Sequence, residues 1–217
     1  MNTALVCSTW LDTTDYLAKT LKFLDYYTQP GIMDALNINS TDIWLVDNAS
    51  DEKLLEWVKN KYNVSVYRYK KHLPRTGHLE YPYCWRGLKW IQNYVKNNNV
   101  NKIIFLDTDF FVLSGKLSDY IKELNSGWVS FYCKRHNFPE AAFHICCQDN
   151  LEKLLFIDVP SYTHYNNQHM EYILPFTYIN KTEFVGDRYG EFGKKQEPDM
   201  DYYGQWHPSL EELKFYD

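Results

Sequence analysis

Residues 102–113 read KIIFLDTDFFVL, an apolar run that leads directly into two aspartates. Because Ile103 to Leu106 are all apolar, the run is typical of a β-strand that is buried on both faces. We expect one strand over 102–113. Asp107 and Asp109 then stand two places apart on the extended chain and point to the same side of it. The stretch predicts a central strand that opens into an acidic cleft.

Three strand-and-helix units precede this stretch. Short apolar runs predict strands over 4–10, 43–47 and 64–69. Apolar residues at helical spacing predict helices over 15–27, after 48–51 and over 82–97. Strands that alternate with helices in this way form a parallel sheet with helices on both faces. We therefore expect an α/β fold of Rossmann-like type, with a mostly parallel sheet flanked by helices.

The second half of the chain has a more mixed pattern. We expect helices over 116–125, 149–156 and 168–174, and strands over 128–132, 142–147 and 175–179. The residues around Pro30 and Gly31 indicate a turn, and the tail from 186 is expected to be loop. No linker divides the sequence, so we expect a single domain over 1–217.

Composition excludes several classes of function. The formal net charge of −5 argues against a general electrostatic grip on nucleic acid or on an anionic membrane. Five cysteines without a CxxC pair favour thiols in a reducing compartment over a disulfide framework or a zinc site. Residues 1–10 lack the pattern of a signal peptide, and no run approaches the length of a membrane span. We expect a cytoplasmic protein. The aromatic content of 18% fits either a bulky core or a cleft lined for sugars.

The carboxyl ends of the expected parallel strands are where ligands bind in such sheets. Asp47, the polar loop 70–82 and the pair Asp107 and Asp109 all fall at these ends. Paired carboxylates repel each other unless a cation joins them, and Mg²⁺ or Mn²⁺ prefers oxygen ligands. Such a cation could bridge the diphosphate of a nucleotide. The alternative is a solvated strand end with two aspartates that bind nothing.

The strand end IWLVDNAS at 43–50, followed about sixty residues later by FLDTD at 105–109, resembles the GT-A glycosyltransferases. The resemblance implies a GT-A sheet with a nucleotide-binding half over 1–113 and a smaller, mixed sugar- and acceptor-binding half over 114–217. It also implies that Asp47 and Asn48 contact the nucleoside of the donor. Asp107, Thr108 and Asp109 would bind the metal and the diphosphate. Asp47 could instead serve as a helix cap or a turn former.

The tail resembles one group of retaining GT-A enzymes, which includes glycogenin and bacterial lipopolysaccharide hexosyltransferases. Their closing motif HFxGxxKPW matches the spacing of DYYGQWHPS at 201–209. This implies that Asp201 replaces a metal-binding histidine and that His207 replaces a lysine on the diphosphate. An ordinary loop rich in glycine and proline is the alternative. Similarity of 166–174 and 142–155 to the same group implies donor contacts at Gln168 and His144.

Two further roles need residues that the motifs do not supply. Basic side chains that could neutralise the donor diphosphate lie between 70 and 86, and among these we expect Arg75 and Arg86 to bind the donor. An inverting enzyme also needs a carboxylate base. The candidates are Asp149, Asp158, Asp187, Glu191 and Asp199, of which we take Asp149 as the catalytic one. A retaining enzyme needs no such base, and the tail favours retention.

The resemblance implies that the chain transfers a hexosyl or deoxyhexosyl group from a nucleoside diphosphate sugar. UDP-sugar is the expected donor, a glycan the expected acceptor, and Mn²⁺ or Mg²⁺ the expected cofactor. Compact enzymes of this kind build bacterial surface polysaccharides or viral glycans, in the latter case in the host cytoplasm. The alternatives are a haloacid dehalogenase-like phosphohydrolase, a nucleotidyltransferase and a GT-A domain that only binds carbohydrate.

Overall fold

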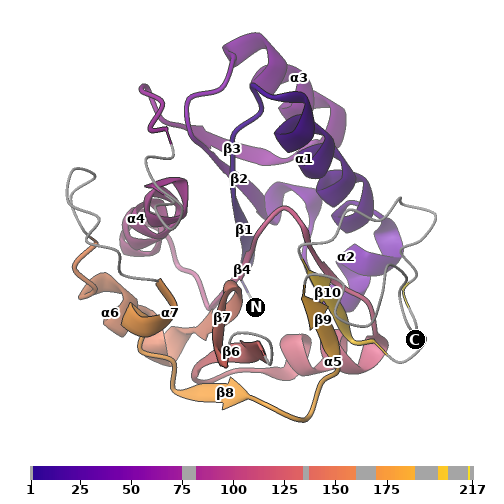
Figure 1. Cartoon of the computed structure of the whole chain (residues 1–217), viewed down its shortest axis with the longest axis vertical. Coiled ribbons are helices and arrows are strands. Elements are labelled where there is room, and N and C mark those ends of the chain that lie inside the picture. The colour runs from indigo at the N-terminus through magenta and orange to yellow at the C-terminus, as the bar shows by residue number, and fades with distance from the viewer. Residues whose placement is uncertain are drawn as a thin grey trace.

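The computed structural model describes residues 2–74, 82–133, 137–159, 170–188, 200–204 and 215. Over these residues the chain forms a seven-stranded sheet and a separate three-stranded sheet (Figure 1). The strands of the large sheet, in spatial order, are β3 (Ser65–Arg68), β2 (Ile43–Asp47), β1 (Thr3–Thr9), β4 (Lys102–Leu106), β7 (Phe138–Cys147), β6 (Trp128–Cys133) and β8 (Tyr178–Asn180). Those of the small sheet are β5 (Phe110–Val112), β10 (Tyr202–Gly204) and β9 (Gly186–Arg188).

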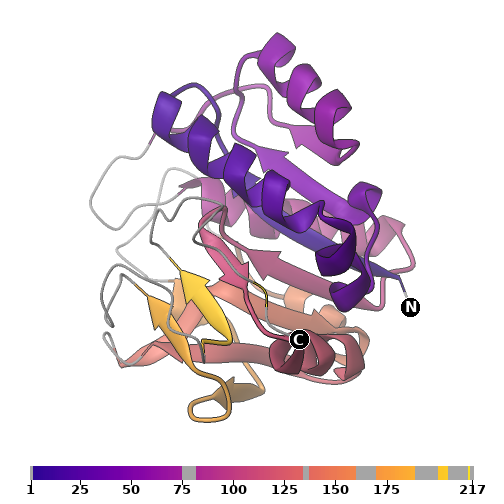
Figure 2. The same ribbon diagram turned by 90° about the vertical axis from the view of Figure 1, so that its right-hand side faces the viewer.

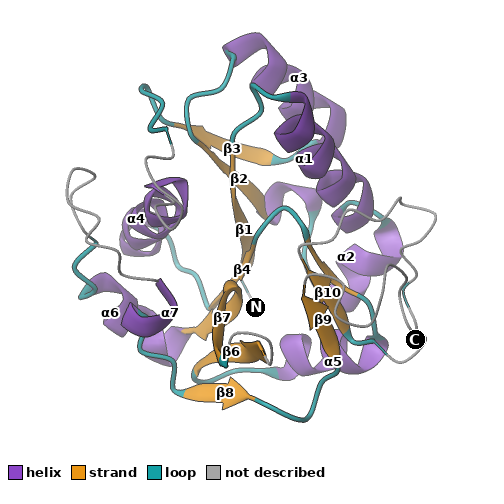
Figure 3. Cartoon of the chain, in the orientation of Figure 1, coloured by secondary structure: helices purple, strands orange, loops and turns teal. Residues whose placement is uncertain are grey.

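Helices connect the strands and cover both faces of the large sheet. They are α1 (Thr14–Tyr27), α2 (Pro30–Leu36), η1 (Ser40–Asp42), α3 (Glu52–Tyr62), α4 (Pro82–Asn97), α5 (Gly115–Glu123), α6 (Gln148–Leu155) and α7 (Met170–Ile173). Figure 3 colours them apart from the strands. Of the described helices, none combines the length and the apolar character that crossing a membrane requires.

Strand direction follows the expected α/β pattern through the first half of the chain. Strand β1 pairs in parallel with both β2 and β4, and β2 pairs in parallel with β3. Strand β7 then runs antiparallel to β4 and to β6, while β6 and β8 are parallel. The sheet is therefore mixed but mostly parallel, and the expected fold class is confirmed.

Alternating side chains on the central strands lie in two hydrophobic cores, one on each face of the sheet. From β1, Leu5 and Cys7 enter the core beneath α1, α2, α3 and α5, whereas Ala4 and Val6 enter the core beneath α4, α6 and α7. Figures 1 and 2 show these two helical layers, and Figure 2 shows the small sheet toward the end opposite the N-terminus. Complete burial of β1 and β4 explains the continuous apolar residues at their centres, 4–7 and 103–106.

Helix α4 approaches β1 unusually closely at Gly87. A Cβ atom built at Gly87 would lie 2.2 Å from Ser8 Oγ and 3.4 Å from a Phe105 ring carbon. Glycine thus lets the helix settle against the strand, as a close backbone approach requires. This contact brings the first turns of α4, with Cys84 and Arg86, down to the carboxyl edge of the parallel strands.

Three local expectations were wrong. The stretch 102–113 forms two strands, β4 and β5, which belong to different sheets. The turn expected at Pro30 is helix α2, because proline at the first helical position has the φ that a helix needs. The tail from 186 contributes the short strands β9 and β10, whose pairing depends on the distant strand β5 and leaves no local pattern in the sequence.

Candidate functional site

The carboxyl ends of four parallel strands bring together the segments that follow β1, β2, β3 and β4. The register places Thr9 opposite Asp47, and Asp47 opposite Arg68, so these strands end level with one another. Strand β4 lies next to β1 and delivers Asp107 to the same edge. The predicted clustering of Asp47 with Asp107 and Asp109 at one edge of the sheet is confirmed.

Asp107, Thr108 and Asp109 form a tight turn instead of continuing a strand. The Phe110 amide donates to the Asp107 carbonyl oxygen over 3.0 Å, which closes the turn. The Asp107 amide donates to the Ala142 carbonyl oxygen over 2.9 Å and ties the turn to β7. Aspartate favours turns because its short polar side chain competes for local backbone groups, and this ends the strand at Leu106 instead of at the expected residue 113.

The turn is the point where the buried strand meets solvent. All five residues of β4 are buried, as is Phe110, whereas Asp107, Thr108 and Asp109 are each half-buried. The two carboxylates act on a common neighbour, the half-buried Cys84 of α4. Burial raises the pKa of that thiol, and so do nearby carboxylates, which in decreasing order of effect are Asp107, Glu171 and Asp109. Three carboxylates therefore act electrostatically on the same thiol.

Glu171 is a site residue that the sequence analysis missed. It belongs to α7, whose Tyr172 ring lies 5.9 Å from the Phe138 ring at the start of β7. Leu106 at the end of β4 pairs with Phe143, so the start of β7 at Phe138 extends five residues beyond that edge. In the segment 166–174 the expected donor contact is Gln168, which lies outside the described residues.

Asp47 is fully buried and bound within its own turn. Its two carboxylate oxygens accept from the Ser50 amide over 2.8 Å and from Ser50 Oγ over 2.5 Å. Ser50 Oγ in turn accepts from the Leu11 amide over 2.7 Å, which joins the ends of β1 and β2. Burial raises the pKa of Asp47, while the bonds from Ser50 oppose that rise. The geometry is that of the turn former considered as the alternative.

Asn48 and Arg86 form a buried polar knot beneath the edge. Arg86 Nη1 donates over 2.5 Å both to Asn48 Oδ1 and to the Lys71 carbonyl oxygen. Asn48 also donates from Nδ2 to the Leu73 carbonyl oxygen over 2.9 Å and accepts at Oδ1 from the Leu73 amide. The Arg86 guanidinium lies 4.5 Å from the centre of the Tyr69 ring. Both side chains hold the loop after β3 in place, and neither points freely into solvent.

His144 lies in the core and not at the edge. The Trp128 indole donates from Nε1 to His144 Nδ1 over 3.1 Å, and the imidazole stacks on Phe105 at 4.9 Å. Only 1% of its surface is exposed, and burial lowers its pKa to about 3. The imidazole is therefore neutral and offers no atom to a sugar in this arrangement, which makes it a core histidine.

Replacing His144 with glutamine is expected to reduce the loss in the free energy of unfolding between pH 7 and pH 5. In the unfolded chain the imidazole binds a proton below about pH 6.5, whereas the folded chain excludes that proton until near pH 3. Stability therefore falls as the pH drops through this window, by about 2 kcal/mol between pH 7 and pH 5 for this one group. Urea unfolding of both proteins at the two pH values measures the difference. Equal losses would mean that His144 titrates normally.

The structure places Asp149, the expected catalytic base, at the opposite edge of the sheet from Asp107 and Asp109. The antiparallel register places Cys147, just before α6, opposite Lys102 at the start of β4. Asp149 follows there, and its carboxylate accepts from the Gly127 amide at 2.9 and 3.1 Å. The five residues of β4, at ~3.3 Å each, separate it from Asp107 by about 17 Å.

Asp201, the expected metal ligand, braces the backbone around the small sheet in the structure. Its carboxylate oxygens accept from Ser114 Oγ over 2.5 Å and from the Val185 amide over 2.8 Å. Its carbonyl oxygen accepts from the Leu113 amide, at the end of β5 remote from Asp109. Within the part of the chain that the structure describes, no three side chains of His, Cys, Asp or Glu gather as a metal-binding group.

Three further expected donor contacts, Arg75, Gln168 and His207, lie outside the described residues. The described site therefore consists of the Asp107–Asp109 turn, Cys84 of α4 and Glu171 of α7. The knot of Asn48 and Arg86 forms the buried support behind it. Its class is an open acidic site at the carboxyl edge of an α/β sheet.

Among the solved structures that match this chain are two that cover nearly all of it. The chain matches S. aureus TarS with a TM-score of 0.51 and 15% identity, over 97% of this chain and 38% of that one. It also matches a glycosyltransferase involved in glycosylation of the major capsid of PBCV-1, with a TM-score of 0.47 and 10% identity, over 97% and 96% of the two chains. No family model and no curated protein matches the sequence. The likeness to TarS shows a shared α/β fold.

Proposed function

We propose that this chain is a glycosyltransferase that transfers a sugar from a nucleoside diphosphate donor, with UDP-sugar first among the candidates. The observation that carries the proposal is the turn Asp107–Thr108–Asp109, half-buried at the carboxyl edge of parallel strands. The fold shared with TarS supports it at the level of architecture. A hexosyl or deoxyhexosyl donor and a glycan acceptor complete the proposal.

The chemistry of the turn fits a hard divalent cation. Asp107 and Asp109 supply carboxylate oxygens from one short turn, and both are partly exposed. Mg²⁺ is commonly held by one or two carboxylates together with substrate phosphates, so the lack of a third described ligand is compatible with binding. A Mn²⁺ or Mg²⁺ ion bound there would stabilise the charge on the departing diphosphate.

We propose a separate role for each of the residues around the turn. Thr108, at the centre of the turn, lies where the donor phosphates would meet the chain. The knot of Asn48 and Arg86 keeps the loop after β3 in position, and we propose that this loop forms the wall of the nucleoside pocket. We also propose that the half-buried Cys84 forms part of the floor of this pocket.

Glu171 takes the place of Asp149 as the proposed general base. Its charge raises the pKa of Cys84, as do those of Asp107 and Asp109, and this shared electrostatic effect supports the choice. A carboxylate in that place suits inversion, in which a base removes the proton of the acceptor hydroxyl. The tail favoured retention through a metal-binding Asp201, but that side chain is bound to Ser114 and Val185. We therefore propose inversion.

The deciding experiment is thermal unfolding with UDP, GDP and CMP, each with Mn²⁺ and again with EDTA. A ligand that binds only the folded state stabilises it by ~2.7 kcal/mol at a hundredfold excess over its dissociation constant. We expect one nucleoside diphosphate to raise the melting temperature in the presence of Mn²⁺, and we expect EDTA to abolish this rise. We also expect the protein to release that diphosphate from the corresponding nucleotide sugar. Release of inorganic phosphate from phosphomonoesters, without any nucleotide effect, would identify a phosphohydrolase instead.

A further inference from the structure

Strand β5 links the acidic turn to the small sheet, and one of its edges has no strand beside it in the described structure. It comprises only Phe110, Phe111 and Val112 and starts directly after Asp109. Its other edge pairs with β10. The edge that faces α1 carries the carbonyl oxygen of Phe110 and both backbone polar groups of Val112. Buried backbone groups of this kind need partners.

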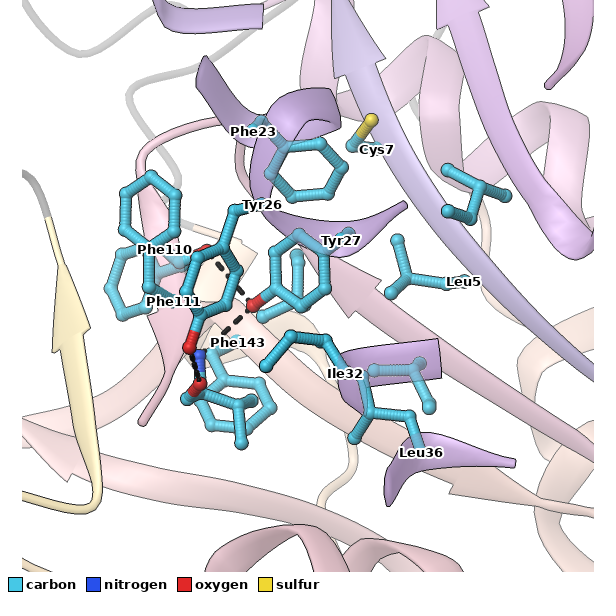
Figure 4. Packing of buried hydrophobic residues seen from close by; sticks show 14 of the residues in the cluster. Leu5, Cys7, Phe23, Tyr26, Tyr27, Ile32, Leu36, Phe110, Phe111 and Phe143 are labelled. Atoms are coloured by element: carbon cyan, nitrogen blue, oxygen red, sulfur yellow. Dashed lines mark hydrogen bonds between the residues drawn. The ribbon is translucent and has the colours of Figure 1, made fainter. Parts of the chain in front are cut away.

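Two adjacent tyrosines at the end of α1 supply those partners (Figure 4). The Tyr27 hydroxyl accepts from the Val112 amide over 3.0 Å and donates to the Phe110 carbonyl oxygen over 3.1 Å. The Tyr26 hydroxyl donates to the Val112 carbonyl oxygen over 2.5 Å. Tyr27 therefore contacts one backbone donor and one acceptor, as a neighbouring strand would.

The backbone groups that accept from the two hydroxyls lie at different distances along the chain from the acidic turn. Tyr27 binds the carbonyl of Phe110, whose own amide closes the turn on Asp107. Tyr26 binds only Val112, two residues further on. Movement of Phe110 would move Asp109, to which it is directly bonded, whereas movement of Val112 can be absorbed within β5.

Packing fixes the Tyr27 hydroxyl firmly. None of the Tyr27 surface is exposed, and its ring lies parallel to that of Phe111 at 6.3 Å and close to that of Phe23 at 4.5 Å. Burial raises the pKa of Tyr27, so the hydroxyl keeps the proton that it donates to Phe110. A rigid group that both donates and accepts can define the position of a short strand.

We propose that Tyr27 is a positioning residue for cation binding, which holds Phe110 so that Asp109 stays in place beside Asp107. The inference rests on the proposed function, because it assigns the cation to these two carboxylates. It predicts that removal of this buried hydroxyl weakens metal binding although the hydroxyl does not contact the metal.

The test compares Tyr27→Phe with Tyr26→Phe, its matched control on the same helix. Each variant loses one buried hydroxyl, and each is expected to lower the melting temperature by roughly 3–6 °C. Mn²⁺ affinity is then titrated well below the melting temperatures, in the presence of the nucleoside diphosphate that wild type binds. We expect the dissociation constant for Mn²⁺ to rise about tenfold in Tyr27→Phe and less than threefold in Tyr26→Phe, which is a loss of ~1.4 kcal/mol against one below ~0.7 kcal/mol.

A second measurement needs no variant and covers the case in which Tyr27→Phe does not fold. Coupling between two sites is reciprocal. If the Tyr27 hydroxyl strengthens metal binding, then metal binding must also strengthen the hydrogen bonds of that hydroxyl to Phe110 and Val112. Binding of Mn²⁺ and nucleotide to wild type is therefore expected to slow hydrogen exchange of the Val112 amide severalfold. The amide of Leu45 in the central sheet serves as the reference.

The outcomes separate the inference from the proposed function. Mn²⁺ affinity equal to wild type in Tyr27→Phe, or unchanged exchange at Val112 on binding, overturns the inference alone. Equal losses of affinity in both tyrosine variants do the same, since a general loosening of β5 would then be the cause. Wild type that binds neither Mn²⁺ nor nucleotide overturns the proposed function, and the inference with it.

Discussion

Asp109→Asn is expected to lower turnover of the nucleotide sugar by about a hundredfold or more while the fold persists. A cation at the phosphates contributes several kcal/mol to transition-state stabilisation, and each ~1.4 kcal/mol is a factor of ten in rate. Asparagine has the size of aspartate and also favours turns, but it lacks the charge that holds the cation. Asp107→Asn is expected to act in the same way. The measurement is nucleoside diphosphate release at saturating Mn²⁺.

Asp149→Asn is the matched control for this prediction. The substitution is chemically identical, but Asp149 lies at the far edge of the sheet and retains one oxygen to accept from Gly127. Its turnover is expected to stay within a factor of two of wild type. Near-normal rates in Asp109→Asn would reject the cation site, whereas a severe loss in Asp149→Asn would restore the catalytic role first expected for it.

Gly204→Ala is expected to reduce the free energy of unfolding by about 2–3 kcal/mol, as overpacking of a filled core does. A Cβ atom at Gly204 would lie 2.4 to 2.7 Å from three carbons of the Phe110 ring. Phe110 is fully buried, so its ring has little room to move away. The displaced ring belongs to the residue after Asp109, so turnover is expected to fall as well. Urea unfolding gives the free energy.

Gly31→Ala gives the comparison for a glycine without neighbours. It lies in the first turn of α2, and no atom comes within 4 Å of an added Cβ. Alanine forms helices better than glycine by up to ~1 kcal/mol, so this variant is expected to match or exceed wild-type stability. If both variants lost stability equally, the packing of Phe110 over Gly204 would not be the cause.

The sequence predicted the parallel half of the fold well because its signals are local. The apolar run at 43–47 and the helical spacing at 82–97 match β2 and α4 residue for residue. Buried parallel strands and their connecting helices differ clearly in period and length, so each can be recognised by itself. The second half depends on pairings between distant residues. Strand β10, for example, exists because Tyr203 meets Phe111, and no pattern near 202–204 indicates that contact.

The candidate site was predicted only in part, for related reasons. Asp107 and Asp109 were found because they follow a strand whose end is visible in the sequence. Asp149 was misplaced because strand order and direction decide which edge a residue reaches, and the reversal of β7 cannot be read from AFHICC. Glu171 was missed because its electrostatic effect on Cys84 depends on the tertiary packing of the four-residue helix α7.

The knot of Asn48 and Arg86 has a consequence for how such a chain can diverge. Each member satisfies another, so a single change at either position leaves a buried polar group without its partner. Lineages that alter one of them must therefore pass through a weakened intermediate or change both together. Among descendants of this sequence, the two positions should vary as a pair, while exposed positions such as Lys70 can change one at a time.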